Sequence, residues 1–402
     1  MGMGPGAVQP ARVDRVSRSG QLSGVAFKYH KFLREAGQPG GGAVRAGKRM
    51  GQKIAWMAAA GLALAGGAAK AGALPAEAAD ILLQAHTKAF VQVRHGRARF
   101  KESTDGGKAA FWRQAEEMEM ELDAGERTAR ARQLALFTNL FRGFIADHGA
   151  DWSQNDFNDD IMWMVIACSR GYLMTGNTEF RDAARANFDL CFARAWSSDL
   201  GGGLWWKTNN LSKNACVNGP AAIAAVLLSR ACREPAYLAK AENIFRWERA
   251  NLYDPASGRV SDHLRRNGHK DDTCYSYNQG TFVGAANLLG HTNDAMQAAT
   301  FTMNHLCRGG LLPAYDETGD GGGFNGICVR WIARFMKDRH AQPVLESWLR
   351  RNAEAAWQVR RPSDNLSWGD WHQATPAGLR YAWNCSSSVV ILQVVPMATA
   401  GP

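Results

Sequence analysis

A repeated pair of helical segments constrains the fold of this chain more than any other feature of its sequence. Five strongly apolar segments each open with an asparagine, and these asparagines follow one another at intervals of 60, 60, 47 and 59 residues. They are Asn158, Asn218, Asn278, Asn325 and Asn384. Between the apolar segments lie more polar, amphipathic ones such as "EFRDAARANFDLCFARAW". A helix that is apolar all round is buried, and an amphipathic helix covers it. The period therefore predicts helical hairpins stacked side by side.

The number of hairpins predicts a closed ring. Extended over the roughly 330 residues that follow residue 73, the period gives about six hairpins. Two early segments, "FWRQAEEMEMELDA" and "RQLALFTNLFRGFIADHG", supply the remaining helices. We therefore predict an all-α fold, an (α/α)6 barrel, in which the N-termini of the inner helices surround one mouth. Strands do not alternate with helices along the sequence, which excludes Rossmann and TIM-barrel architectures. We expect each opening asparagine to be the N-cap of its helix.

The net charge is concentrated at the start of the chain. The chain carries +10, and residues 1–73 hold eleven Lys and Arg against only Asp14 and Glu35. The nearly neutral remainder gives no basis for a nucleic-acid-binding surface. "KRMGQK", the apolar "IAWMAAAGLALAGG" and a small-residue cleavage site form a secretory signal that is too short for stable membrane insertion.

We accordingly divide the chain into three parts. Residues 1–49 are an extension that is either disordered or translated from a mis-assigned upstream start, residues 50–73 are the signal peptide, and residues 74–402 are the catalytic domain. The expected product is exported to the periplasm or secreted, as a monomer.

Two adjacent carboxylates open the first of the apolar segments. Asp159 and Asp160 fall in the first helical turn, where unpaired N–H groups favour negative charge. Consecutive helical positions differ by about 100°, so the two side chains can flank a bound substrate. Retaining glycosidases need two carboxyl groups about 5–5.5 Å apart, one as nucleophile and one as protonated acid. The charge of one carboxylate opposes ionisation of the other, which gives the pair two roles. On spacing alone, a pair that only complements the helix dipole is an equal alternative.

Metal chemistry is the other interpretation of these carboxylates. "DFNDD" places Asp156 in a D-x-x-D-D array with the pair, like the clusters that hold magnesium and diphosphate in helical prenyl-transfer enzymes. The chain has no second acidic motif to complete such a cluster, and its eight cysteines have neither CxxC nor Cys/His metal spacing. We expect no metal and no cofactor.

Aromatic and amide side chains predict a carbohydrate site. Trp205 and Trp206 follow "SSDLGGG", where three glycines permit unusual backbone and close approach. Aromatic faces beside amide side chains suit a pyranose ring. The expected substrate-binding residues are Trp205, Trp206, Asn214, Asn218, Asp271, Asp272, Tyr277, Gln279 and Arg330. Asp271 and Asp272 lie in a polar loop, and a solvated loop is their alternative. Arg330 is the strongest inner-helix cation, and only a wider basic patch would indicate a uronate-specific enzyme.

Five segments in order resemble glycoside hydrolase family 76, the endo-α-1,6-mannanases. They are "AAFWRQAEEMEME", "NDDIMWMVIACSRGYLMTGN", "GGGLWWKTNNLSKNACVNGPAAIAAVLLSRAC", "YSYNQGTFVGAANLLGHTND" and "FNGICVRWIARF". The resemblance implies an (α/α)6 barrel and a retaining mechanism without metal, with Asp159 as nucleophile, Asp160 as acid/base and α-mannan or a related glycan as partner. The loops "SDHLRRNGHKDD" and "DETGDGGG" are expected to bound the cleft and depart from the mannanase pattern, which leaves the substrate open. A non-hydrolytic glycan-binding or transglycosylating envelope protein that uses the same cleft is the alternative.

Overall fold

Twelve α-helices in two layers make up the part of the chain that the computed structural model describes, residues 74–129, 131–339 and 343–395. The inner helices are α2 (Phe111–Thr128), α4 (Asn158–Thr175), α6 (Ala215–Cys232), α8 (Ser276–Leu288), α10 (Phe324–Arg339) and α12 (Ala382–Val394). The outer helices are α1 (Ala78–Phe90), α3 (Ala131–His148), α5 (Thr178–Ala195), α7 (Pro235–Asn251), α9 (Thr292–Phe301) and α11 (Pro343–Gln358). Short turns complete the helical set: η1 (Asp199–Gly201), η2 (Thr302–Leu306) and η3 (Asp320–Gly323).

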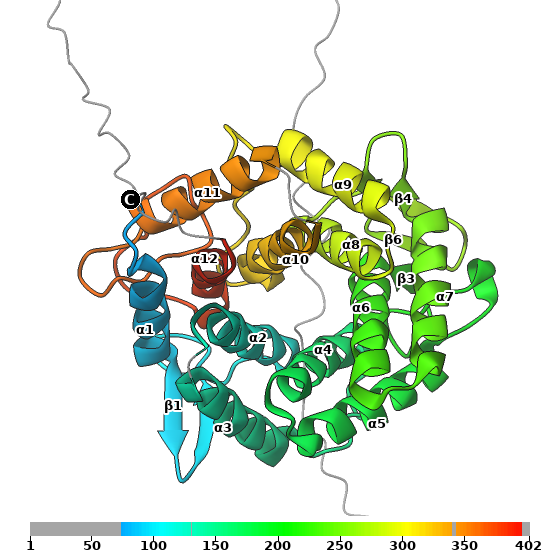
Figure 1. The fold of residues 1–402 in the computed structure, drawn as a ribbon, viewed down its shortest axis with the longest axis horizontal. Coiled ribbons are helices and arrows are strands. Elements are labelled where there is room, and N and C mark those ends of the chain that lie inside the picture. Colours follow the sequence, from blue (N-terminus) through cyan, green and yellow to red (C-terminus); the bar gives the residue numbers. More distant parts are fainter. Residues whose placement is uncertain (1–73, 130, 340–342, 396–402) are drawn as a thin grey trace, which may run out of the picture. The chain divides into compact units, whose positions relative to one another are not determined.

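The inner helices form a closed ring (Figure 1). Each packs against the next, and α12 packs against α2. Helices α3, α5, α7, α9 and α11 each cover the inner helix that precedes them in sequence. The two ends of the fold supply the last hairpin, because α1 packs outside α12. His86 of α1 joins them through a contact of 3.1 Å between its Nε2 and the carbonyl oxygen of Ala382. The predicted (α/α)6 barrel is confirmed.

The segments that connect the helices form three small antiparallel sheets. The all-α prediction did not include these sheets. The strands are β1 (Val91–Arg94), β2 (Arg97–Phe100), β3 (Ser212–Asn214), β4 (Tyr253–Asp254), β5 (Arg259–Val260), β6 (His263–Arg265) and β7 (Lys270–Asp271). They pair as β1-β2, β3-β6-β7 and β4-β5. The three-stranded sheet joins the loop before α6 to the loop before α8, so it shapes the same mouth as the starts of those helices.

The prediction that the opening asparagines are N-caps is wrong. Phe157 is the N-cap of α4 and Tyr381 that of α12, neither with a side-chain cap, and Asn158 and Asn384 lie inside the first turn. Their side chains hold loops instead. Asn158 Nδ2 donates to the carbonyl of Trp205 at 2.8 Å, and Asn384 Oδ1 accepts from the backbone N–H of Gly369 at 3.1 Å. Each amide bonds a loop because the first turn of its inner helix packs directly against that loop.

The same use of asparagine recurs in the other inner helices. Asn218 bonds both the N–H and the carbonyl of Leu204. Asn278 donates to Asp262 at 3.0 Å, and Asn325 donates to the carbonyl of Pro313 at 2.8 Å. All five opening asparagines are buried, so the repeat in the sequence marks the anchoring of mouth loops on the inner ring.

Helix α6 is the most apolar member of the inner ring. Among the described helices it alone is long and apolar enough to cross a membrane, and 83% of that stretch is buried inside the protein. It packs against α4, α7 and α8. Such burial is what the core helix of a barrel requires.

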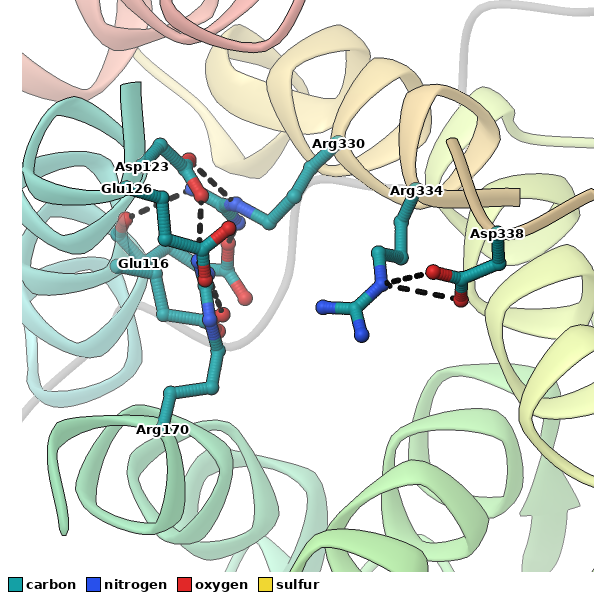
Figure 2. A network of polar contacts seen from close by, with 8 residues as sticks. Glu116, Asp123, Glu126, Arg170, Arg330, Arg334 and Asp338 are labelled. Carbon is teal, nitrogen blue, oxygen red and sulfur yellow. Dashed lines mark hydrogen bonds and ion pairs between the residues drawn. The ribbon is translucent and has the colours of Figure 1, made fainter. Parts of the chain in front are cut away.

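Helix α2 departs from the expectation that inner helices are apolar all round. Its buried side chains include Glu116, Glu117, Glu119, Glu121 and Asp123. Buried carboxylates need ionic or hydrogen-bonding partners, or a proton. Arginines from the facing helices supply part of that need, as Figure 2 shows.

Candidate active site

The adjacent carboxylates lie where the sequence placed them, in the first turn of α4. Asp159 and Asp160 are the second and third residues of the helix, and both are partly exposed. The loop-anchoring asparagines of the inner ring lie at the same, N-terminal end of their own helices. The pair is therefore held at the mouth defined by the inner-helix N-termini.

Asp159 is fixed by two donors from neighbouring elements. Its Oδ2 accepts from the indole Nε1 of Trp206 at 2.9 Å and from the thiol of Cys216 at 3.3 Å. Its Oδ1 is buried without a hydrogen-bond partner among the described residues. Burial and the negative charge of Asp160 raise the pKa of Asp159 well above its ordinary value, and the two donors oppose that rise.

Asp160 has a different environment. Its Oδ2 accepts from Asn155 Nδ2 at 2.9 Å. Burial, with a smaller contribution from the negative charge of Asp320, raises its pKa to about 6, while the Asn155 donor and the positive charge of Arg113 act against this shift. Because both pKa values are raised, protonation of the pair is favoured at higher pH than for ordinary aspartates.

Trp206 reaches Asp159 because the preceding loop is tightly folded. Gly203 has φ +81°, and a Cβ at this position would lie 2.4 Å from the ring of Trp247. The predicted close approach of this glycine segment is confirmed. Lys213, whose side chain is fully buried, donates from Nζ to the carbonyls of Ser197 at 3.0 Å and Asp199 at 2.6 Å. Lys213 also donates to the carbonyl of Gly202. One ammonium group therefore binds three carbonyls of the same loop and stabilises its fold.

Aromatic rings from several inner helices line the region beside the pair. Tyr277 stacks on Phe324 with centroids 3.8 Å apart and an interplanar angle of 16°. The ring centroid of Trp163 lies 6.5 Å from that of Tyr277 and 6.4 Å from that of Trp112. Burial and the nearby groups Cys216, Asp262 and Asp159 raise the pKa of Tyr277 well above its ordinary value. Tyr277 and Trp206 are partly exposed and can present apolar faces to a ligand.

Trp205 is placed differently from Trp206, away from the partly exposed region beside the pair. Its side chain is buried, and its ring lies under Lys213, with Nζ 4.6 Å from the centroid. Consecutive side chains of an extended segment point to opposite sides. Trp205 therefore packs inward, while the indole of Trp206 contacts Asp159.

The amide side chains predicted to bind substrate make hydrogen bonds within the protein. Asn218 is fully buried and bonds the backbone of Leu204. Gln279 is also fully buried; its Nε2 donates to the carbonyls of Gly258 and Ala298 at 3.1 Å. Asn214 accepts from the hydroxyl of Ser212 at 2.7 Å. Asn218 and Gln279 therefore anchor loops in this structure, and substrate binding by the three amides stays a prediction.

The charged candidates also serve the loops or the far end of the barrel. Asp271 caps the turn at Thr273, bonding its N–H at 3.0 Å. Asp272 accepts from Ser261 at 2.8 Å and pairs with Arg259 at 3.2 Å. Arg330 is six residues into α10, about 9 Å along the helix axis from its start, and pairs with carboxylates of α2. Asp271 and Asp272 thus stabilise the loops and Arg330 the barrel interior, and their contact with substrate stays a prediction.

Four side chains beside the pair were not singled out from the sequence. Cys216 and Asn155 bond the two carboxylates directly. Arg113 of α2 pairs with Asp320 of η3 at 3.0 Å, and both charges act on Asp160. The loop "DETGDGGG" was expected to bound the cleft, but no sequence signal connects it to α2.

The D-x-x-D-D array is not assembled around an ion site. Asp156 accepts from the hydroxyl of Thr208 at 2.8 Å on an exposed loop. Within the described ranges, no three His, Cys, Asp or Glu side chains are arranged to hold a metal ion.

A closed ring of six helical hairpins with two adjacent acids in the first turn of an inner helix defines a glycoside hydrolase of the helical-barrel class. The family model for glycosyl hydrolase family 76 matches residues 76–397, and the chain belongs to this family. Among the curated proteins, none matches the chain.

Solved structures with the same fold include enzymes of known action. The GH76A α-1,6-mannanase from Salegentibacter sp. HEL1_6 is 29% identical, covers 79% of this chain and 98% of its own, and has a TM-score of 0.73. An inactive variant of that enzyme, with asparagine replacing two adjacent aspartates, was solved with α-1,6-mannotriose. Dfg5 from Chaetomium thermophilum, in complex with glucosamine, is 16% identical with a TM-score of 0.67, covers 79% of this chain and 88% of its own, and shares the fold.

Proposed function

We propose that the protein is an exported, retaining endo-glycosidase that cleaves α-1,6-mannosidic linkages. The observation that carries this proposal is the adjacent pair Asp159 and Asp160, with raised pKa values, at the mouth of a family 76 barrel. The similarity to an α-1,6-mannanase whose adjacent-aspartate variant is inactive supports the same pair and the same linkage here.

The hydrogen bonds of the pair support one assignment of the two roles. Asp159 receives donors on Oδ2 from Trp206 and Cys216, which favour its anion and fix its orientation, and its Oδ1 has no hydrogen-bond partner in the described part of the chain. A nucleophile needs such an oriented carboxylate. Asp160 is therefore the acid/base. Burial works against this assignment by raising the pKa of Asp159 more than that of Asp160. Since the pair shares one proton, the productive form is the tautomer with that proton on Asp160.

The reaction then has two steps. Asp160 gives its proton to the glycosidic oxygen while Asp159 attacks the anomeric carbon, and the leaving sugar departs. This step leaves a mannosyl ester on Asp159 and a carboxylate on Asp160. Asp160 next takes a proton from water, which attacks the same carbon, releases Asp159 and gives a product with the original configuration.

Trapping by azide tests both the pair and its roles. Asp159→Ala and Asp160→Ala should each lose hydrolysis of α-1,6-mannan while retaining the wild-type circular dichroism spectrum. With an activated aryl α-1,6-mannobioside, azide should give a β-glycosyl azide from the Asp159 variant and an α-glycosyl azide from the Asp160 variant. The opposite anomers would reverse the roles, and wild-type hydrolysis by either variant would remove the pair from the mechanism.

The same assay separates hydrolysis from transfer. Hydrolysis releases a reducing end for every bond broken, whereas transglycosylation lengthens oligosaccharides without such release. We expect a mannotetraose with α-1,6 linkages to give shorter products and new reducing ends. Chains longer than the substrate, with few reducing ends, would indicate an envelope transglycosylase.

Export follows from residues 50–73, which lie outside the described part of the chain. The basic, apolar and small-residue regions are those of a secretory signal. N-terminal sequencing of the protein recovered from the periplasm or medium should begin near residue 72 or 74. Recovery of full-length protein only from the cytoplasm would refute export.

A further inference from the structure

A cavity lies at the opposite end of the barrel from Asp159 and Asp160. It has a volume of about 860 Å³ and is lined by the C-terminal halves of all six inner helices. Its lining includes Asp123 of α2, Arg170 of α4, Arg230 of α6, Leu288 of α8 and Arg334 of α10. The proposed glycosidase mechanism uses none of these residues.

The floor of this cavity is a paired ionic network (Figure 2). Arg170 donates to Glu119 at 2.7 Å, to Asp123 at 2.8 Å and to Glu126 at 3.1 Å. Arg330 donates to the other oxygen of Asp123 at 2.7 Å and also to Glu116. Burial raises the pKa of Glu116 to about 8, so a proton offsets part of the excess negative charge. The two floor arginines are fully engaged.

Three cations at the rim are not engaged in the same way. Arg334 bonds Asp338 only through Nε, and its two terminal nitrogens carry no contact to any residue drawn in Figure 2. Arg230 and Lys337 are exposed and have no hydrogen bond or ion pair among the described residues. Arg230, Arg334 and Lys337 are called the rim cations below.

The acidic side chains of the lining form no ion pair with the rim cations among the described residues, although the charges of Arg334 and Lys337 act on Glu126. Asp123 and Glu126 bond Arg170, and Glu346 pairs with Arg350 at 2.7 Å. Arg230 and Arg334 come from different helices. Burial lowers the pKa of Arg230, the positive charge of Arg334 adds to that shift, and the negative charge of Asp338 opposes it. Two like charges brought together over an open cavity favour an anion between them.

Compensation of helix dipoles is the plainest alternative for basic residues at helix C-termini. Such a residue typically donates to terminal carbonyls. Arg339 does so, bonding the carbonyl of Asn287 at 2.7 Å, and Arg127 is paired with Asp80 and Gln393. Arg230 and Lys337 make no such bond among the described residues, so their hydrogen-bond donors remain available to a ligand.

The rest of the lining indicates the kind of anion. Leu227, Leu288, Trp331 and Met336 give the cavity an apolar wall beside the rim cations. Two guanidinium groups and an ammonium match the three terminal oxygens of a phosphate better than the two of a carboxylate. We propose that this cavity binds a phosphate monoester, with the phosphate on the rim cations and the organic group against the apolar wall.

Calorimetric titration of the intact protein with phenyl phosphate tests the proposal. We expect saturable binding with a Kd on the order of 1 mM or lower, weaker binding of inorganic phosphate, and none of neutral benzyl alcohol. The double variant R230Q/K337Q should weaken phenyl phosphate binding by about tenfold or more, because two charged donors are lost. The matched double variant R246Q/K88Q removes two exposed cations from α7 and α1 and should bind like wild type.

Thermal unfolding verifies that the variants are folded, which their exposed positions favour. No saturable binding by wild type, or equal binding by R230Q/K337Q and wild type, would overturn the proposal. Sedimentation with phosphatidylcholine vesicles, with and without phosphatidic acid, distinguishes the sources of the ligand. Capture that requires phosphatidic acid and the rim cations indicates a lipid headgroup, and binding of phenyl phosphate alone indicates a soluble ester.

Discussion

The indole Nε1 of Trp206 donates to Oδ2 of Asp159 over 2.9 Å, joining the loop before α6 to the first turn of α4. An indole can only donate a hydrogen bond, so this contact favours the anion of Asp159. The same loop is fastened by Gly203 and Lys213. Loop geometry and carboxylate chemistry are therefore linked through one side chain.

Trp206→Phe removes that donor while keeping an aromatic face. A hydrogen bond to a charged group contributes about 1.5–3 kcal/mol, so we expect kcat on α-1,6-mannan to fall by about 10- to 100-fold. The pKa of Asp159 should rise further. Trp368→Phe is the control, because that indole donates only to the carbonyl of Gln373. Equal activity of the two variants would show that the Trp206 contact has no catalytic effect.

The pH profile should reflect a pair that shares one proton. With the pKa of Asp160 raised to about 6, a second proton binds below about pH 6 and blocks the nucleophile. Activity should therefore rise with pH through about 6. It should fall again at higher pH, where the shared proton is lost from a pair whose Asp159 has a strongly raised pKa.

Asp160→Asn isolates the other carboxylate. With an activated aryl glycoside, which needs no acid, we expect the alkaline fall in kcat/KM to disappear, since only ionised Asp159 is then required. The pKa of Asp159 should also fall, because the neighbouring charge is gone. An alkaline limb that persists in Asp160→Asn would assign it to a different group.

Gly203→Ala tests the fold of the loop behind Trp206. Gly203 has φ +81°, and an added Cβ would lie 2.4 Å from the ring of Trp247. Gly176 is the matched control, with φ +73° and open space around the same position. We expect about 1 kcal/mol of destabilisation for Gly176→Ala from backbone strain and at least about 2 kcal/mol more for Gly203→Ala from the clash. Urea unfolding measures both, and equal losses would exclude the clash.

Lys213→Met should damage the same loop from the other side. It leaves three carbonyl acceptors without their ammonium donor, at about 1–3 kcal/mol for each buried group left unpaired. Lys207→Met, at a partly exposed position over the ring of Phe157, is the control and should cost under about 1 kcal/mol. Equal urea midpoints for the two variants would refute the structural role of Lys213.

The architecture and the position of the adjacent carboxylates Asp159 and Asp160 could be predicted because their signals are local. Apolar segments at a fixed period indicate an inner ring, and the first turn of α4 is readable from "NDDIMWM". Contacts made across the ring are not readable in this way. The asparagines at the helix starts look like N-caps, but their amides bond loops from elsewhere in the chain.

Arg330 shows the same limit for a charged residue. From sequence it is a cation on an inner helix; in the structure it pairs with Glu116 and Asp123, more than 200 residues away. Helix α2 was an unremarkable acidic segment for the same reason, since its partners lie on α4 and α10. Only the closed ring brings these charges together.

Arg330→Gln separates stability from substrate binding. Removing one partner of a buried ion pair typically costs about 3–5 kcal/mol, because Glu116 and Asp123 would be left short of positive charge. We expect a lower urea midpoint, with a partial offset at acidic pH, where a proton on Glu116 replaces the lost arginine. Burial already raises the pKa of Glu116 to about 8 and Arg330 opposes that rise, so its removal should raise the pKa further. The folded state then takes up a proton that the unfolded state does not bind, and the loss of stability should grow as the pH rises through that pKa.

The folded variant should keep the wild-type KM for α-1,6-mannan within about twofold, a difference of under about 0.5 kcal/mol. A large increase in KM with unchanged stability would instead place Arg330 in contact with the glycan.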